Sequence, residues 1–157
     1  MTFDDLGAVT NIYNIAIKEG RSTFNSKLFT PQLWEESHLF NCRYVYLKDD
    51  KVVGWIALCP MSKRECYKGC VEVSLYVHPD YRSQGVGTAL LSYLIKESEK
   101  KGYWSLYSCI FSTNTQSIKL HQKLGFRLIG EREKVAKDIF GVWQNTTLLE
   151  LRSNLII

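Results

Sequence analysis

No apolar run in this chain of 157 residues approaches the roughly 20 residues that a membrane-spanning helix needs. The basic residues are scattered, with no block longer than Lys100-Lys101, and the net charge of +4 is too small to imply nucleic acid. Three histidines are present, and none lies close in sequence to Cys66 and Cys70. The sequence therefore predicts no membrane, nucleic-acid or metal partner.

The N-terminus lacks the basic segment and the apolar core of a signal peptide. The five cysteines form an odd set without the spacing of a disulfide framework, at Cys42, Cys59, Cys66, Cys70 and Cys109. Both observations favour reduced thiols and a cytoplasmic protein. The slight excess of positive charge suits an anionic small ligand.

The apolar spacing predicts one mixed α/β domain over residues 1–157, without repeats, linkers or low-complexity segments. Helices are expected at about 4–18, 31–40, 88–101 and 115–124, with Thr30-Pro31 as the start of the second. Strands are expected at about 43–47, 52–59, 70–77, 104–111, 126–135 and 143–152. A turn at Lys48–Lys51 joins the first two strands as an antiparallel hairpin.

A glycine loop, Arg82-Ser83-Gln84-Gly85-Val86-Gly87, connects the strand at 70–77 to the following helix. Glycines admit positive φ and leave no Cβ between the backbone and a ligand. The free amide groups and the dipole of a helix N-terminus then suit a phosphate group. The pattern is neither the Walker loop nor the dinucleotide fingerprint, so a tight structural turn is the alternative reading.

Glu72 is a single carboxylate inside a strand whose apolar residues alternate. Val71, Val73, Leu75 and Val77 are expected on one face, and Glu72, Ser74 and Tyr76 on the other. In one reading, Glu72 lies on a solvated face. In the other, it is a general base.

Five short motifs give this chain its resemblance to a known family. They are Glu-Gly-x-x-Thr-Phe at 19–24, Pro-x-Ser-x-Arg at 60–64, Glu-x-Ser-x-Tyr-Val-His-Pro at 72–79, Asn-x-x-Ser-Ile at 114–118 and Leu-His-x-x-Leu-Gly-Phe at 120–126. With the glycine loop, they resemble the GCN5-related N-acetyltransferases (GNAT), and the phosphinothricin and methionine sulfone acetyltransferase branch in particular. The resemblance covers most of the chain.

This resemblance implies a GNAT fold, an α/β architecture with a mixed, mostly antiparallel sheet that is splayed between its fourth and fifth strands and flanked by helices. It implies acetyl-CoA as the cosubstrate. Backbone amides of Gln84–Thr88 would bind the pyrophosphate, and the backbone of Leu75–Val77 would hold the pantetheine and act as an oxyanion site. The full set of implied cofactor-binding residues is Leu75, Tyr76, Val77, Arg82, Ser83, Gln84, Gly85, Val86, Gly87, Thr88, Asn114 and Ser117.

The resemblance also assigns catalytic and acceptor-binding positions. Glu72 matches the general base that takes a proton from the acceptor's ammonium group. His121 matches the position of the acid that protonates the leaving thiolate, although a helix histidine there can also serve packing alone. Acceptor binding is expected from Phe24, Arg64, Tyr67, Glu72 and Ser74, with an ordinary surface arginine as the alternative for Arg64.

Two departures from the family pattern stand out. Relatives begin with a strand reading Ile/Val-Arg-x-Ala/Met, whereas this chain begins Met1-Thr2-Phe3-Asp4-Asp5. The first strand is therefore expected to be short or missing, because of either a misassigned start or an exposed sheet edge. Asn145 stands where the branch often has aspartate, which places the identity of the acceptor in question.

The leading functional prediction is acetyl transfer from acetyl-CoA to the α-amine of a small amino-acid-like acceptor, such as phosphinothricin, methionine sulfone or methionine sulfoximine. One alternative keeps the reaction and changes the acceptor to an aminoglycoside, a polyamine or a protein N-terminus. Another is a non-catalytic acyl-CoA-binding sensor. Family membership further implies a homodimer.

Overall fold

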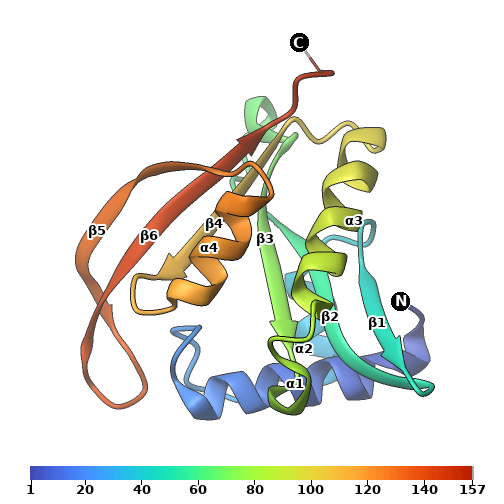
Figure 1. The fold of residues 1–157 in the computed structure, drawn as a ribbon, viewed down its shortest axis with the longest axis vertical. Helices are drawn as coiled ribbons and strands as arrows, with labels where there is room; N and C mark the ends of the chain where they lie inside the picture. The colour runs from blue at the N-terminus through green and yellow to red at the C-terminus, as the bar shows by residue number, and fades with distance from the viewer. Residues whose placement is uncertain (157) are drawn as a thin grey trace.

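The computed structural model describes residues 1–156 and contains a six-stranded sheet with helices on both faces (Figure 1). The α-helices are α1 (Leu6–Glu19), α2 (Pro31–Ser37), α3 (Val86–Lys100) and α4 (Thr115–Lys123). The strands are β1 (Tyr44–Lys48), β2 (Lys51–Pro60), β3 (Cys70–Val77), β4 (Ser105–Phe111), β5 (Arg127–Lys137) and β6 (Trp143–Arg152). Each predicted helix and strand is present, and the expected α/β architecture is confirmed.

The sheet divides into two halves that separate along β3 and β4. Its strand order is β1-β2-β3-β4-β6-β5. The β3–β4 pair is parallel and is registered only over Cys70–Glu72 opposite Ser105–Tyr107, whereas the other pairs are antiparallel. Figure 1 shows β3 and β4 diverging toward their C-terminal ends. The expected opening of the sheet therefore lies between β3 and β4, because residues 1–5 contain a short 3-10 helix and no strand.

Two hydrophobic cores lie on opposite faces of the sheet. Leu90, Leu91 and Leu94 of α3 pack on one face, together with apolar residues of β2, β3 and β4. Residues of α1 and α2 form the second core against Trp55 and Ala57 of β2. On β3, Val71, Val73, Leu75 and Val77 belong to the first core and Tyr76 to the second, so the predicted alternation is correct. Burial on both faces fixes the register of β3, since a one-residue slip would exchange the faces.

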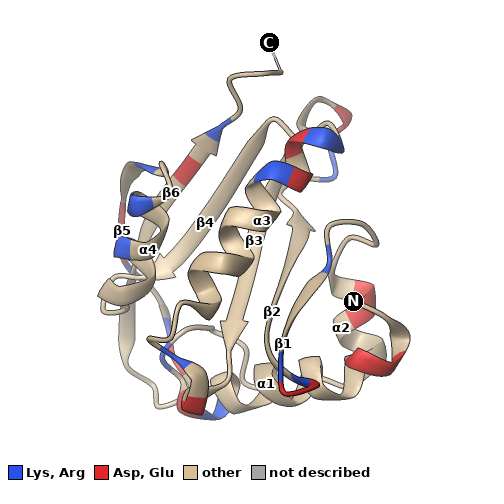
Figure 2. Cartoon of the chain, turned by 45° about the vertical axis from the view of Figure 1, so that its right-hand side comes forward, with Lys and Arg blue, Asp and Glu red and all other residues tan. Residues whose placement is uncertain are grey.

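Basic and acidic residues lie close together at the C-terminal end of α3, where Lys96, Glu97, Glu99 and Lys100 lie (Figure 2). No helix among the described residues is long and apolar enough to cross a membrane.

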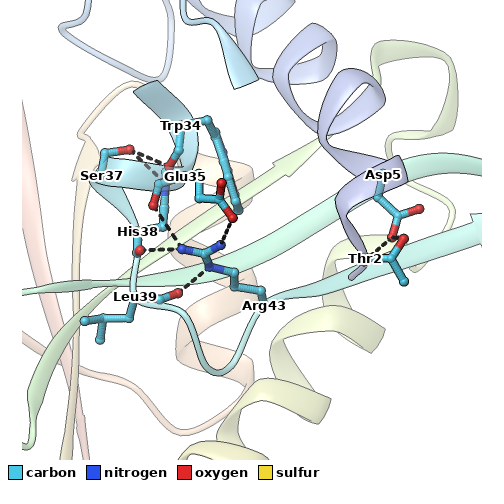
Figure 3. Close-up of polar contacts among 8 residues, drawn as sticks. All are labelled: Thr2, Asp5, Trp34, Glu35, Ser37, His38, Leu39 and Arg43. Carbon is cyan, nitrogen blue, oxygen red and sulfur yellow. Dashed lines mark hydrogen bonds and ion pairs between the residues drawn. The ribbon is translucent and has the colours of Figure 1, made fainter. Parts of the chain in front are cut away.

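Helix α2 is shorter than predicted. The Oγ1 of Thr30 accepts a hydrogen bond from the amide of Leu33 and Pro31 opens the helix, as expected. The helix ends at Ser37 rather than Phe40, because His38 adopts an extended conformation. The Arg43 guanidinium donates to the carbonyl groups of Glu35, His38 and Leu39 (Figure 3). Arg43, which lies in the segment between α2 and β1, thus binds the carbonyl groups at the helix end, a contact that helix propensity does not encode.

His38, at the end of α2, forms a buried cluster with Trp34 and Arg43 that contributes to the stability of the protein. Its ring stacks on Trp34 at a centroid distance of 4.2 Å, and its Nδ1 donates to the Trp34 carbonyl at 2.7 Å. The side chain is buried, and this burial, with a smaller contribution from the Arg43 charge, lowers the pKa of His38 from 6.5 to about 4.

We predict that His38 makes the fold sensitive to mild acid. Below pH 6.5 the unfolded chain binds a proton at His38 that the native protein does not bind until about pH 4, so stability is lost as the pH falls through this window. The loss is expected to be about 3 kcal/mol. Denaturant unfolding at several pH values measures it. The variant His38→Gln should have a flatter profile, with His78→Gln, outside the cluster, as control; an unchanged slope in His38→Gln would contradict the assignment.

Candidate active site

The loop between β3 and α3 presents unpaired backbone amides. Ser83 and Gly85 have φ values of 59° and 83°, in the left-handed region. The first hydrogen bond of α3 runs from the Ala89 amide to the Gly85 carbonyl, which leaves the amides of residues 86–88 without a partner in the helix. Successive free amides and the helix dipole favour an anion at this position.

A cavity of about 780 Å³ opens beside this loop, between β3 and α4. Most of the predicted cofactor-binding residues line it, namely Leu75, Tyr76, Val77, Arg82, Ser83, Gly85, Gly87, Thr88, Asn114 and Ser117. Two predicted residues do not. The Gln84 side chain donates to the Asp80 carbonyl and accepts from Lys48, while Val86 is buried in the first core.

Arg82 ties the glycine loop to the end of α1. Its guanidinium forms two hydrogen bonds with the Glu19 carboxylate, at 2.8 and 3.2 Å, and its Nε donates to the Val77 carbonyl. The Arg82 and Glu19 side chains both line the cavity of about 780 Å³, which is called the larger cavity below. Glu19 is a part of this site that the sequence analysis quoted as a motif without giving it a role.

A second cavity of about 360 Å³ lies on the α1 and α2 side of the sheet. It contains Glu72, Phe24, Ser74 and His121 of the predicted catalytic and acceptor residues. Five residues line both cavities, namely Ser22, Leu75, Tyr76, Asn114 and Ser117. The cavities therefore meet where the sheet opens between β3 and β4.

Among residues 1–156, Glu72 is the only acidic residue that lines the smaller cavity, and no lysine or arginine lines it. In the sheet register Glu72 lies between Cys59 of β2 and Tyr107 of β4. Burial raises the pKa of the Glu72 carboxyl, and the charge of Arg132 partly opposes this rise. Burial and the Glu72 charge raise the pKa of Cys59 to about 12, so this neighbouring thiol stays protonated near neutral pH.

His121 reaches the smaller cavity from α4 on the other face of the sheet. Its Nδ1 lies 2.8 Å from the Ser117 carbonyl, which can only accept, so Nδ1 carries the proton. Burial lowers the pKa of His121, and the hydrogen bond to Ser117 partly offsets this. The resting imidazole is therefore neutral near pH 7, with Nε2 as an acceptor.

Arg64 and Tyr67, two of the predicted acceptor residues, lie on the exposed loop between β2 and β3 and do not line the smaller cavity. The Arg64 guanidinium lies 5.6 Å from the centroid of the Tyr67 ring. The structure thus brings Phe24 and Ser74 to Glu72 but leaves these two side chains outside that cavity.

The loop at residues 21–30 forms one wall of the smaller cavity and is anchored to α1. Asn14 donates to the Phe29 carbonyl at 2.9 Å and accepts from the Phe29 amide at 2.8 Å. The Tyr13 hydroxyl accepts from Asn25. Phe24 packs on Phe111 of β4 at 4.5 Å between ring centroids. Several further wall residues are not recognisable from the sequence, because they meet only after α1, α2 and the sheet assemble; these are Tyr13, Thr23, Asn25, Phe29, Ser37, His38, Cys59 and Cys109.

Comparisons with known proteins agree with this geometry. Residues 9–126 match the acetyltransferase (GNAT) family. An L-methionine sulfoximine/L-methionine sulfone acetyltransferase of Pseudomonas aeruginosa is 30% identical over 153 residues, which cover 94% of this chain and 88% of the relative.

Two solved structures are similar over nearly the whole chain. A ribosomal-protein-alanine N-acetyltransferase from Brucella melitensis has a TM-score of 0.90 and 28% identity, covering 98% of this chain and 97% of its own. A phosphinothricin acetyltransferase from Sinorhizobium meliloti, in complex with acetyl-CoA, has a TM-score of 0.89 and 26% identity, covering 97% and 85%. With the family match over most of its length, this chain belongs to the GNAT family of acetyltransferases.

Proposed function

We propose that this protein is an acetyl-CoA-dependent N-acetyltransferase that acts on the α-amine of a small amino-acid-like acceptor. The observation that carries the proposal is the junction of two cavities at Leu75 and Tyr76, with free loop amides in the larger cavity and Glu72 in the smaller. Such a junction lets a thioester and an amine meet from opposite sides of the sheet.

Acetyl-CoA fits the larger cavity by its chemistry. The free amides after Gly85 suit the pyrophosphate, and the part of β3 that has lost its pairing with β4 offers backbone polar groups to the pantetheine. The solved relative from Sinorhizobium meliloti contains acetyl-CoA. Asn114 caps α4 by accepting from the Ser117 amide, which orients both residues at the cavity junction.

Glu72 would take a proton from the acceptor's ammonium group, directly or through water, and the free amine would attack the thioester carbonyl. Backbone groups of Leu75–Val77 would stabilise the oxyanion. The C–S bond then breaks, and the CoA thiolate needs a proton while the new amide nitrogen must lose one. Because His121 is neutral at rest, its Nε2 can receive the nitrogen's proton and pass it to sulfur.

The smaller cavity fits a compact acceptor with one amine. Aromatic rings from Tyr13, Phe24, Phe29 and Phe111 contribute to its walls, and Glu72 supplies one carboxylate. A polyamine or an aminoglycoside usually requires several carboxylates, which these walls lack. Arg64 and Tyr67 on the nearby loop are proposed to contact the polar head of the acceptor side chain. The name of the Brucella melitensis relative keeps a protein N-terminus as the second candidate acceptor.

A homodimer and a cytoplasmic location complete the proposal. Exposed apolar side chains occur along β5, β6 and the turn between them, namely Leu128, Ile129, Val135, Phe140, Val142 and Trp143. An edge hairpin with exposed apolar side chains suits a second copy of the chain. All five cysteines are free thiols, which suits a reducing compartment.

We predict that phosphinothricin, methionine sulfone or methionine sulfoximine is acetylated at least tenfold more efficiently than spermidine or kanamycin. The physical reason is the single carboxylate of the cavity, which matches one ammonium group and leaves further positive charges unpaired. Release of free CoA thiol over this acceptor panel measures kcat/KM. If spermidine, kanamycin or an N-terminal alanine peptide gave the highest value, the acceptor assignment would be wrong.

A further inference from the structure

An amino-acid acceptor brings a carboxylate to the smaller cavity, whose walls, in the part of the chain that the structure describes, contain no lysine or arginine. Next to Glu72, a second unpaired carboxylate would be strongly unfavourable. If the proposed function is correct, a cation at the rim must therefore meet the acceptor's carboxylate. Arg64 lies against the Tyr67 ring on the exposed loop, which leaves the other cations on the same face of the sheet as candidates.

The register of the sheet places Arg132 of β5 on the face that carries Glu72. Thr146 of β6 lies opposite both Phe111 of β4 and Arg132. Residues directly opposite each other share a face, so Arg132 lies on the same face as Phe111, which lines the smaller cavity. Two strand spacings, about 10 Å, separate the two backbones, a distance over which a long arginine side chain can reach the cavity rim.

A bulge in β5 and the Asn145 side chain hold this part of the strand. Pairing with β6 is regular from Gly130 to Arg132 and resumes only at Ala136, with Lys134 at a φ of 45°. Asn145 accepts from the Lys134 amide at 2.8 Å and donates to the Glu131 carboxylate at 3.0 Å. An aspartate could not donate to Glu131, so the departure from the family pattern at Asn145 suits this local structure.

Arg132 itself is free to bind. Among residues 1–156 its guanidinium has no hydrogen bond and no ion pair, and the residue is exposed. Arg127, the other arginine of β5, is instead paired with Glu150. The charge of Arg132 also lowers the pKa of both Glu72 and Tyr107, against the larger effect of burial on each. The positive charge of Arg132 is therefore close enough to Glu72, the proposed base, to influence its protonation.

We propose that Arg132 binds the α-carboxylate of the acceptor and so selects amino acids over amines that lack this group. The inference deepens the proposed function and depends on it. A planar guanidinium can hold a carboxylate by two parallel hydrogen bonds, which fixes the α-amine relative to Glu72. Asn145 acts as a positioning residue through the bulge.

The experiment compares L-methionine sulfone with its primary α-amide, which keeps the amine and removes the negative charge. We expect Arg132→Gln to lower kcat/KM for the acid by roughly 10- to 100-fold, mainly through KM, and to change the value for the amide by less than about twofold. Arg132→Lys should recover part of the loss, because a lysine restores charge without the planar pair of donors. The ratio between acceptors is compared across variants, so the different basicity of the two amines cancels.

Lys137→Gln, which removes one positive charge from the same strand, is the matched control, and Arg64→Ala tests the competing cation. The inference is overturned if Arg132→Gln lowers both acceptors equally or neither, or if the preference for the acid is lost in Arg64→Ala instead. A wild type that acetylates neither acceptor contradicts the proposed function itself. A wild type that acetylates both, with Arg132→Gln unchanged, contradicts only the role of Arg132.

Discussion

Replacing Glu72 by glutamine is expected to lower turnover by about 10²- to 10⁴-fold while leaving acetyl-CoA binding intact. The side chain keeps its size, and the smaller cavity loses the only carboxylate that the described residues contribute to its walls. Ammonium groups of amino acids are protonated at neutral pH, and only the free amine attacks a thioester. Burial already raises the pKa of Glu72, which makes it a stronger base than an exposed glutamate.

Steady-state kinetics as a function of pH separate this role from a structural one. Because the pKa of Glu72 is raised from 4.5, the contribution of Glu72 to the acidic limb of kcat/KM should lie above pH 4.5 in the wild type. Only this contribution should be absent from the variant, which keeps His121. Glu150→Gln is the matched control, since Glu150 lies opposite Tyr107 in the same row of the sheet and outside both cavities. Turnover of Glu72→Gln within threefold of wild type would show that the amine loses its proton to bulk water.

Gly85→Asp is expected to abolish the stabilisation of the protein by acetyl-CoA. In the wild type a hundredfold excess over Kd should stabilise by about 2.7 kcal/mol, a rise in Tm of about 5 to 10 °C. A carboxylate at position 85 would lie where the loop amides favour an anion, and it would repel the pyrophosphate. We expect acetyl-CoA affinity to fall by at least about 10²-fold.

Gly102→Asp supplies a close control for this variant. Gly85 and Gly102 have φ values of +83° and +85°, and a Cβ at either position would meet no atom within 4 Å. Aspartate tolerates this conformation better than most residues, so the backbone cost should be similar at both sites. Gly102→Asp should keep the full thermal shift with acetyl-CoA. Equal thermal shifts with acetyl-CoA in the two variants would show that this loop does not bind the pyrophosphate.

The sequence predicted the elements that depend on short-range patterns. Alternation fixed β3 and its two faces, and the Lys48–Lys51 turn has positive φ at Asp49 and Asp50, as a tight hairpin requires. The prediction was wrong at the end of α2, because Arg43, in the segment between α2 and β1, binds carbonyl groups there. Helix propensity does not report a side-chain contact that comes from beyond the helix.

In the candidate site, too, some residues follow from short-range sequence patterns and others come together only in the folded chain. The glycine loop and Glu72 belong to one continuous stretch, so their neighbourhood follows from sequence. The acceptor walls combine α1, the loop at 21–30, α2, α4 and the three strands β2, β3 and β4, and residues such as His38 and Asn25 are not recognisable before these meet. Arg132 was overlooked for a similar reason, since its relation to Phe111 depends on the register of both strands with β6.

The parting of β3 and β4 has a consequence for how such a protein changes over evolutionary time. After Glu72, β3 is no longer paired with β4, and the polar groups on its open edge are main-chain N–H and C=O groups. Almost every amino acid has these main-chain groups. A substitution in β3 therefore keeps the main-chain groups of this wall. The acceptor walls consist of individual side chains, so each substitution there changes the groups that contact the acceptor. A fold of this kind can keep one donor and exchange acceptors, and a backbone that superimposes with a TM-score of 0.90 at 28% identity accords with such drift.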